Sequence, residues 1–130
     1  MGKILIVDDD SAMSRLYKSA FTLSGYDAKT AADGKEALEK LSVPEDKPDI
    51  IFLDMMMPKL NGFDVLEHIK KDNRLKDIPV IALTNISSLP EGPHDFQKIR
   101  SLGAVDIIIK SQADPQKVVA RAAEIIASRR

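Results

Sequence analysis

Polar side chains able to do chemistry follow four of the five short apolar runs in this sequence. They are Asp8, Asp9, Asp10, Asp54, Thr84 and Lys110. Carboxylates brought together repel one another and become partly protonated unless a cation joins them. Oxygen ligands of this kind select a hard ion, for which Mg²⁺ is the default. Such an ion, an ammonium and a hydroxyl around one carboxylate would stabilise a transferred phosphoryl group, and a carboxylate can itself form an acyl phosphate.

Five short strands that alternate with helices are expected to carry these side chains. The apolar runs are Ile4–Val7, Tyr26–Ala31, Ile50–Leu53, Val80–Leu83 and Val105–Ile109. Four of them are continuous rather than alternating, which is typical of strands buried on both faces of a sheet. The segments between them have helical periodicity, with capping residues such as Asp33 and Asp114 at their starts. This order predicts an α/β fold, a doubly wound parallel sheet of five strands with helices on both faces.

The residues that follow each strand indicate the strand order. Ligands of open parallel sheets bind beyond the carboxyl ends of the strands, near the point where the strand order reverses. The second run ends only in Ala31 and Ala32, whereas each of the other four delivers a polar group. The order 2-1-3-4-5 fits this asymmetry, because it leaves the second strand away from the site.

Length, charge and composition exclude several classes of protein. The chain has 130 residues, and its 19 Lys and Arg against 20 Asp and Glu leave a formal charge of -1. This size predicts one domain over residues 1–130 with no output domain, and the charge balance predicts no nucleic-acid or membrane partner. There is no cysteine, which excludes disulfides, thiol chemistry and cysteine metal sites. The first apolar run is too short for a signal peptide or a membrane span, which predicts a cytoplasmic protein.

The motifs at the strand ends resemble those of the receiver domain of two-component response regulators, in particular the stand-alone CheY-like kind. The matching motifs are Ile4-Leu5-Ile6-Val7-Asp8-Asp9, Ile51-Phe52-Leu53-Asp54 with Met57-Pro58 and Gly62, Ala82-Leu83-Thr84, and Gly103-Ala104 leading to Lys110. The resemblance spans the whole chain and implies a flavodoxin-like fold. It also implies that Asp54 accepts a phosphoryl group from a histidine kinase or a histidine phosphotransfer protein.

The resemblance implies a role for each of the other site residues. The ligands implied for Mg²⁺ are Asp9 and Asp54, then Asp8 acting largely through water, and the backbone carbonyl of Met56. Thr84 and Lys110 would hold the phosphoryl oxygens. The chain would be no enzyme in the usual sense, since it would catalyse only its own phosphorylation and dephosphorylation. Its output would be contact with an unknown downstream protein through the fourth helix, fifth strand and fifth helix, as a monomer or weak dimer.

Three residues depart from the pattern of that family. Ile107 stands where the family usually has an aromatic residue, Asn85 where the residue after the threonine is usually small, and Ser111 where proline usually follows the lysine. A cis bond before a residue other than proline costs about 3 kcal/mol, so we expect a trans Lys110–Ser111 bond. The connection Asn85–Pro93 is also longer than usual. The matching motifs predict an intact acceptor site, whereas these departures predict a rebuilt surface for partner contact.

Two other functions fit some of the same residues. A small Mg²⁺-dependent phosphohydrolase resembling the haloacid dehalogenase superfamily would use Asp8 as nucleophile and Asp10 as acid/base. Against this alternative, Ala12 stands where such enzymes have threonine or valine. A degenerate receiver would bind a partner without phosphorylation. For Asp10 we favour a structural interpretation, as the N-terminal cap of the first helix.

The methionines and histidines near these motifs have mainly structural interpretations. Met57 is expected to pack, and Met55 and Met56 are expected to line the loop after the third strand. As a further hypothesis, Met56 shields an acyl phosphate from water and lengthens its life. His68 and His94 are expected to be solvated.

Overall fold

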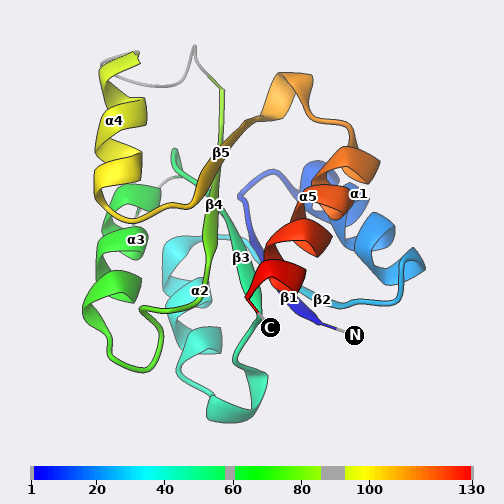
Figure 1. Cartoon of the computed structure of the whole chain (residues 1–130), viewed down its shortest axis with the longest axis horizontal. Helices are drawn as coiled ribbons and strands as arrows, with labels where there is room; N and C mark the ends of the chain where they lie inside the picture. Colours follow the sequence, from blue (N-terminus) through cyan, green and yellow to red (C-terminus); the bar gives the residue numbers. More distant parts are fainter. Residues whose placement is uncertain (1, 58–60, 86–92, 130) are drawn as a thin grey trace.

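The computed structural model describes residues 2–57, 61–85 and 93–129. In this part of the chain five parallel strands form one sheet in the order β2-β1-β3-β4-β5, which confirms the predicted order (Figure 1). The strands are β1 (Lys3–Val7), β2 (Asp27–Ala31), β3 (Ile50–Asp54), β4 (Val80–Thr84) and β5 (Asp106–Ile109). β3 and β4 each run one residue beyond the predicted apolar run, so Asp54 and Thr84 are the last residues of their strands.

Helices cover both faces of the sheet, as the alternation of elements predicted. They are α1 (Ser11–Leu23), α2 (Gly34–Leu41), α3 (Gly62–Lys71), α4 (Pro93–Ser101) and α5 (Pro115–Ser128). Short 3₁₀ turns add η1 (Pro44–Asp46) and η3 (Lys110–Gln112). α1 and α5 lie on one face, and α2, α3 and α4 lie on the other (Figure 1). The sheet therefore separates two hydrophobic cores.

Alternate residues of the central strands fill these two cores. In β1, Leu5 and Val7 belong to the core shared with α2, α3 and α4, while Ile4 and Ile6 belong to the core shared with α1 and α5. None of the four is more than 4% exposed. Burial on both faces explains why this run is continuously apolar in the sequence. It also makes the strand end a well-packed support for the polar residues that follow.

Acidic residues cap the helices that follow β1, β2 and β5. Asp10 accepts hydrogen bonds from the N–H groups of Ala12 and Met13, at 3.0 and 3.2 Å. Asp33 and Asp114 do the same for the first turns of α2 and α5. These contacts satisfy N–H groups that a helix start leaves without a partner. The predicted helix starts and the capping role of Asp10 are confirmed.

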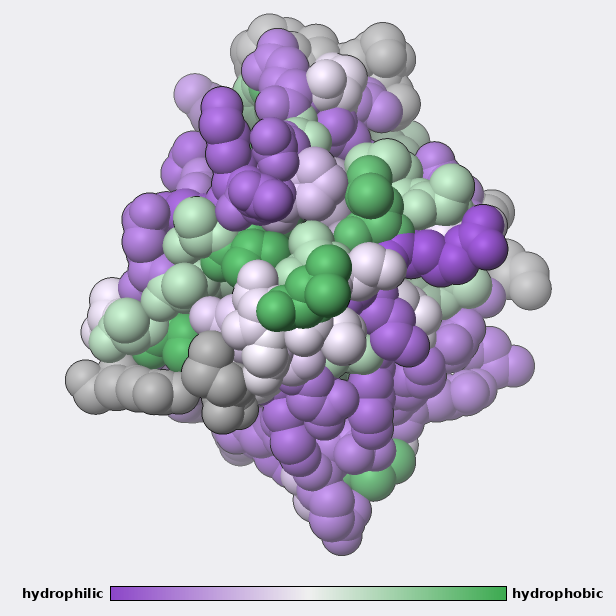
Figure 2. Space-filling view, turned by 90° about the vertical axis from the view of Figure 1, so that its right-hand side faces the viewer, coloured by the Kyte–Doolittle hydropathy of each residue, from purple (hydrophilic) through white to green (hydrophobic). Residues whose placement is uncertain are grey.

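The face formed by α1 and α5 carries an apolar groove. Figure 2 shows apolar side chains gathered near the middle of this side of the molecule. Two leucines of α1 are unusually open here, with Leu16 50% exposed and Leu23 88% exposed. The groove between the two helices extends to Asp114 and Pro115, at the start of α5. It therefore reaches the carboxyl edge of the sheet, where the polar strand ends lie.

Two of the expectations concern residues that lie wholly or partly outside the described ranges. The long connection expected at Asn85–Pro93 lies largely outside the described residues, and so does the side chain of His94. His68 is exposed, as expected. Over the described ranges, no helix has the length and apolar character that crossing a membrane would require.

Candidate functional site

The paired ends of β1 and β3 bring acidic residues together. The two strands are paired up to Val7 and Leu53, so Asp8 and Asp54 leave neighbouring strands at the same level. Both residues are buried, at 1% and 4% exposure, whereas Asp9 is exposed. Carboxylate oxygens of these three aspartates all lie within 4.8 Å of one another. The prediction that acidic residues from different strand ends meet at one edge of the sheet is confirmed.

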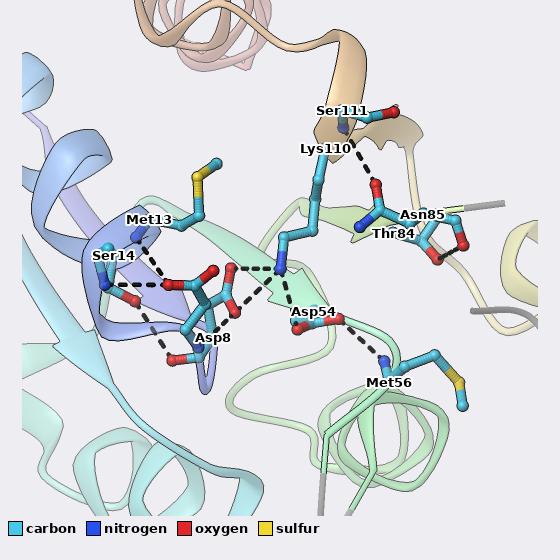
Figure 3. A network of polar contacts seen from close by, with 11 residues as sticks. Asp8, Met13, Ser14, Asp54, Met56, Thr84, Asn85, Lys110 and Ser111 are labelled. Atoms are coloured by element: carbon cyan, nitrogen blue, oxygen red, sulfur yellow. Dashed lines mark hydrogen bonds and ion pairs between the residues drawn. The ribbon is translucent and has the colours of Figure 1, made fainter. Parts of the chain in front are cut away.

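Lys110 reaches this cluster from the other side of the sheet edge. β4 and β5 are paired up to Thr84 and Ile109, so Lys110 is the first residue after the last pair. Its Nζ lies 3.1 and 2.9 Å from the two carboxylate oxygens of Asp8, and 3.4 Å from Oδ2 of Asp54 (Figure 3). The lysine side chain is only 12% exposed. Because little water screens these charges, one ammonium offsets much of the repulsion between the two carboxylates.

Asp54 has a partner for each of its carboxylate oxygens. Oδ1 accepts a hydrogen bond from the N–H of Met56 at 3.0 Å, and Oδ2 faces Lys110. Burial raises the pKa of Asp54 to about 7, and the charge of Asp8 adds to the rise, whereas the Met56 N–H and the Lys110 ammonium oppose it. A further cation at the cluster would therefore favour the ionised form of Asp54, which is the nucleophilic form.

The acidic cluster has the composition of a hard-cation site. Oδ2 of Asp8 is buried, and its cationic partner among the described residues is the Lys110 ammonium, 2.9 Å away. The same ammonium also faces Asp54, so one positive charge is shared by two buried carboxylates, and a second cation would lower their remaining repulsion. The exposed Asp9 gives an ion an approach from solvent. Three carboxylates, one of them exposed, suit Mg²⁺ or a similar hard ion. The expected use of the Met56 carbonyl stays a prediction.

Thr84 lies at the same edge but is not bonded to the cluster. The residue is 1% exposed, and its Oγ1 donates a long hydrogen bond of 3.4 Å to the backbone carbonyl of Asn85. In the described part of the chain, no hydrogen bond joins Thr84 to Asp54 or Lys110. The structure therefore brings the acidic residues and the lysine together, and leaves the threonine hydroxyl turned toward the backbone carbonyl of Asn85.

Comparison with known proteins identifies the family to which this arrangement belongs. A family model described as the response regulator receiver domain matches residues 4–123. The chain belongs to this family. Response regulator receiver domains are signalling modules of two-component systems rather than enzymes in the usual sense.

Solved structures of receiver proteins have the same fold as this receiver domain. The receiver domain of the Francisella response regulator 1452 is 28% identical and superimposes with a TM-score of 0.86 over the whole of both chains. The chemotaxis protein CheY4 of Vibrio cholerae is 27% identical, with a TM-score of 0.82 over 95% of this chain and 98% of its own. The CheY-like, flavodoxin-like fold implied by the sequence motifs is confirmed.

Curated relatives of this receiver domain correct one expectation. The "DNA-binding dual master transcriptional regulator RpaA" of Synechocystis is 37% identical over 93% of this chain and 47% of its own length. A "probable transcriptional regulator ycf27" of Porphyridium aerugineum is 34% identical over 95% of this chain and 48% of its own length. The chain thus spans about half the length of these relatives. The expectation of no nucleic-acid partner was wrong, because the charge of a receiver domain says nothing of the partners through which such a regulator works.

The three departures of this receiver domain from the family pattern have visible consequences. The Lys110–Ser111 bond is trans, as expected. The N–H of Ser111, which a proline would lack, donates a hydrogen bond of 3.1 Å to Oδ1 of Asn85. Ile107 is partly buried and packs against the core shared with α2, α3 and α4. Two of the departures are therefore partners in one contact.

The methionines after β3 differ in position from one another. Met57 is 8% exposed and belongs to the core, which confirms the expected packing. Met55 is also part of the core and fully buried, so the expectation that it lines the loop was wrong. Met56 is half-buried. Because the side chain of Met56 is outside the core, it can be substituted to test whether it shields an acyl phosphate.

Two features of the site were not foreseen from the sequence. A Cβ at Gly62 would lie 2.4 Å from both the carbonyl oxygen of Asp54 and the Cα of Met55. Only glycine at position 62 therefore lets the start of α3 lie this close to the end of β3. The second feature is the Asn85–Ser111 hydrogen bond. Its only signal in the sequence was that both residues are unusual in the family.

Proposed function

We propose that this receiver domain is a phosphorylation-controlled switch in which Asp54 accepts a phosphoryl group from a histidine of a kinase or phosphotransfer protein. The observation that carries the proposal is the position of Asp54 at the end of β3, the central strand. Asp8 and Asp9 lie on one side of it, and Lys110 and Thr84 lie on the other. A carboxylate between metal ligands and a cation is equipped for phosphoryl transfer.

In the proposed step, an oxygen of the Asp54 carboxylate forms a bond to phosphorus while the bond between phosphorus and the donor histidine nitrogen breaks. The electron pair of that bond leaves with the imidazole. The Nζ of Lys110 lies 3.4 Å from Oδ2 of Asp54. Its positive charge can therefore stabilise the new phosphoryl oxygens as well as the carboxylate. Rotation of the Thr84 hydroxyl away from the carbonyl of Asn85 would give those oxygens a second donor.

The cation proposed for the acidic cluster is Mg²⁺. Its ligands would be Asp9 and Asp54, with Asp8 acting largely through water and the Met56 carbonyl as a further ligand. When bound, the ion would supply positive charge to the carboxylates and to the phosphoryl oxygens. The support for this ligand set is the convergence of the three carboxylates, two of which are buried and share the Lys110 ammonium.

Labelling with acetyl phosphate and Mg²⁺, followed by the mass of the intact protein, tests the proposal. We expect the parent protein to gain one phosphoryl group and Asp54→Asn to gain none. Asp64→Asn, which neutralises an exposed carboxylate on α3, is the matched control and should label as the parent does. Labelling that persists in Asp54→Asn would contradict the proposal.

The same experiment decides between the two alternatives left open by the sequence. A phosphohydrolase using Asp8 would label in Asp54→Asn and fail to label in Asp8→Asn. This alternative is disfavoured because its acid/base, Asp10, is occupied as the cap of α1. A degenerate receiver would take no label although Asp54 is intact.

The apolar groove between α1 and α5 is our proposed docking surface for the phosphodonor protein. The donor must reach Asp54 at the carboxyl edge, and the groove extends to that edge and carries the exposed Leu16. Leu16→Lys should slow phosphoryl transfer from the donor protein and leave labelling by acetyl phosphate unchanged. An equal effect on both reactions would contradict a docking role.

For the output we propose control of transcription. The support is that relatives matching more than nine-tenths of this chain are named transcriptional regulators, one of them DNA-binding. Because the chain spans about half of their length, contact with DNA would be made through another domain or a partner protein. Crosslinking of the native protein to chromosomal DNA, with and without an intact Asp54, would test this output. A cytoplasmic location stays a prediction.

A further inference from the structure

A side-chain hydrogen bond joins the two strand ends that carry the proposed phosphoryl-binding groups. Asn85 follows Thr84 directly, and Ser111 follows Lys110 directly. Oδ1 of Asn85 accepts a hydrogen bond from the N–H of Ser111 at 3.1 Å, across 26 residues of sequence (Figure 3). The bond therefore spans the gap just beyond Thr84 and Lys110.

This bond extends the pairing of β4 and β5 by one step. The last backbone pair of the two strands is Thr84 with Ile109, after which β4 ends and η3 begins. Lys110 consequently lies between two fixed points, the paired Ile109 before it and the bonded N–H of Ser111 after it. From this position its Nζ reaches both Asp8 and Asp54. The backbone of Lys110, which sets the direction of its ammonium group, is thus fixed at the residue before it and at the residue after it.

Asn85 also contacts the other proposed phosphoryl-binding group. Its backbone carbonyl accepts the 3.4 Å hydrogen bond from Oγ1 of Thr84. One residue therefore touches the threonine through its backbone and the lysine turn through its side chain. Loss of the side-chain bond would free the backbone that carries both contacts, without touching a carboxylate of the acidic cluster.

The chemistry at positions 85 and 111 is complementary. A proline at 111 would offer no N–H, and a small apolar residue at 85 would offer no side-chain acceptor. With serine at 111 the N–H is present, and the carboxamide of Asn85 satisfies it. The two departures from the family pattern thus form one interaction rather than two independent changes.

We propose that Asn85 is a positioning residue, whose side chain holds the N–H of Ser111 so that Thr84 and Lys110 keep the spacing that a phosphoryl group on Asp54 requires. The proposal rests on the proposed function of Asp54. It separates two properties of the site, because the cation ligands come from β1 and the end of β3, whereas the Asn85–Ser111 bond joins β4 to η3. Loss of the bond should weaken phosphoryl binding and leave cation binding nearly intact.

The test compares the affinities for two probes, Mg²⁺ alone and beryllium fluoride at saturating Mg²⁺, both measured by calorimetry. Beryllium fluoride is the probe because it mimics a phosphoryl group on a carboxylate. Asn85→Ala removes the acceptor, and Ser111→Pro removes the donor. Each should weaken beryllium fluoride binding about 2- to 10-fold, the range that corresponds to one ordinary hydrogen bond, with Mg²⁺ affinity unchanged. The variant that combines Asn85→Ala with Ser111→Pro should have the same beryllium fluoride affinity as the single variant with the larger loss, because both substitutions remove the same hydrogen bond.

Two control variants accompany the test. Ser111→Ala keeps the N–H and loses only the hydroxyl, and Asn73→Ala removes an exposed asparagine away from the site. Both should bind beryllium fluoride as the parent does.

Three results would overturn the inference alone: unchanged beryllium fluoride affinity in Asn85→Ala, an equal loss of Mg²⁺ affinity, or single losses that multiply in the double variant. A parent protein that binds Mg²⁺ but no beryllium fluoride would overturn the proposed function together with it.

Discussion

The two halves of the site are built in different ways. The acidic half, at the ends of β1 and β3, rests on strands buried on both faces and paired up to the last residue before the carboxylates. The other half, at the ends of β4 and β5, depends in addition on a side-chain bond between Asn85 and Ser111. The backbone ladder alone is enough to gather the acidic residues, whereas the phosphoryl-binding half needs a specific pair of side-chain and backbone groups. The two halves should therefore respond differently to substitution.

Removal of Lys110 should have the largest effect, because this residue joins the two halves. Lys110→Ala leaves two buried carboxylates without their shared cation and removes a donor to the phosphoryl oxygens. The initial rate of labelling by acetyl phosphate should fall about 100-fold, as when a charged or oxyanion-binding donor is lost from other sites. Lys117→Ala, at an exposed lysine of α5, is the control. A rate within twofold of the parent would mean that the halves act separately.

A side chain at Gly62 should disturb the acidic half through its backbone. The Cβ of Gly62→Ala would lie 2.4 Å from the carbonyl oxygen of Asp54, so β3 and α3 must move apart. The free energy of unfolding, measured with urea, should fall by about 1–3 kcal/mol, as for other overpacked sites. Mg²⁺ affinity should fall as well, because Asp54 moves. Unchanged stability would show that the helix shifts without strain.

The acidic half should bind Mg²⁺ more tightly as the pH rises. Burial raises the pKa of Asp54 to about 7, so below this pH the cation must displace a proton, and above it the carboxylate is already ionised. Between pH 6 and pH 8 the affinity should increase by about tenfold from this group. Calorimetry at several pH values checks the slope, and Asp54→Asn, which has no proton to release there, should lose it. A flat profile in the parent would contradict the account.

The smallest effect is expected at Met56, beside the acidic half. If its half-buried side chain shields the acyl phosphate, Met56→Asn should dephosphorylate a few-fold faster than the parent, because an amide admits and orients water. The decay of the phosphorylated protein, followed by intact mass, measures this. Equal decay rates in Met56→Asn and the parent would contradict the shielding role.

The different construction of the two halves also explains which parts of the structure could be predicted from sequence. Continuous apolar runs mark buried strands, and in parallel sheets the residues after such strands converge, so Asp8, Asp54 and Lys110 could be placed together. The cap at Asp10 was predictable because it is a local interaction. The Asn85–Ser111 bond was not, because it joins two polar residues far apart in sequence and no periodicity links them. The close approach at Gly62 likewise depends on how α3 packs on the sheet.

The location of the phosphoryl group in the protein decides whether Asp54 is the acceptor. The parent protein is labelled with acetyl phosphate and Mg²⁺, digested at low temperature, and its peptides are sequenced by mass spectrometry. We expect one phosphoryl group, on Asp54 at the end of β3. A phosphoryl group on Asp8, or on no aspartate of the cluster, would contradict it.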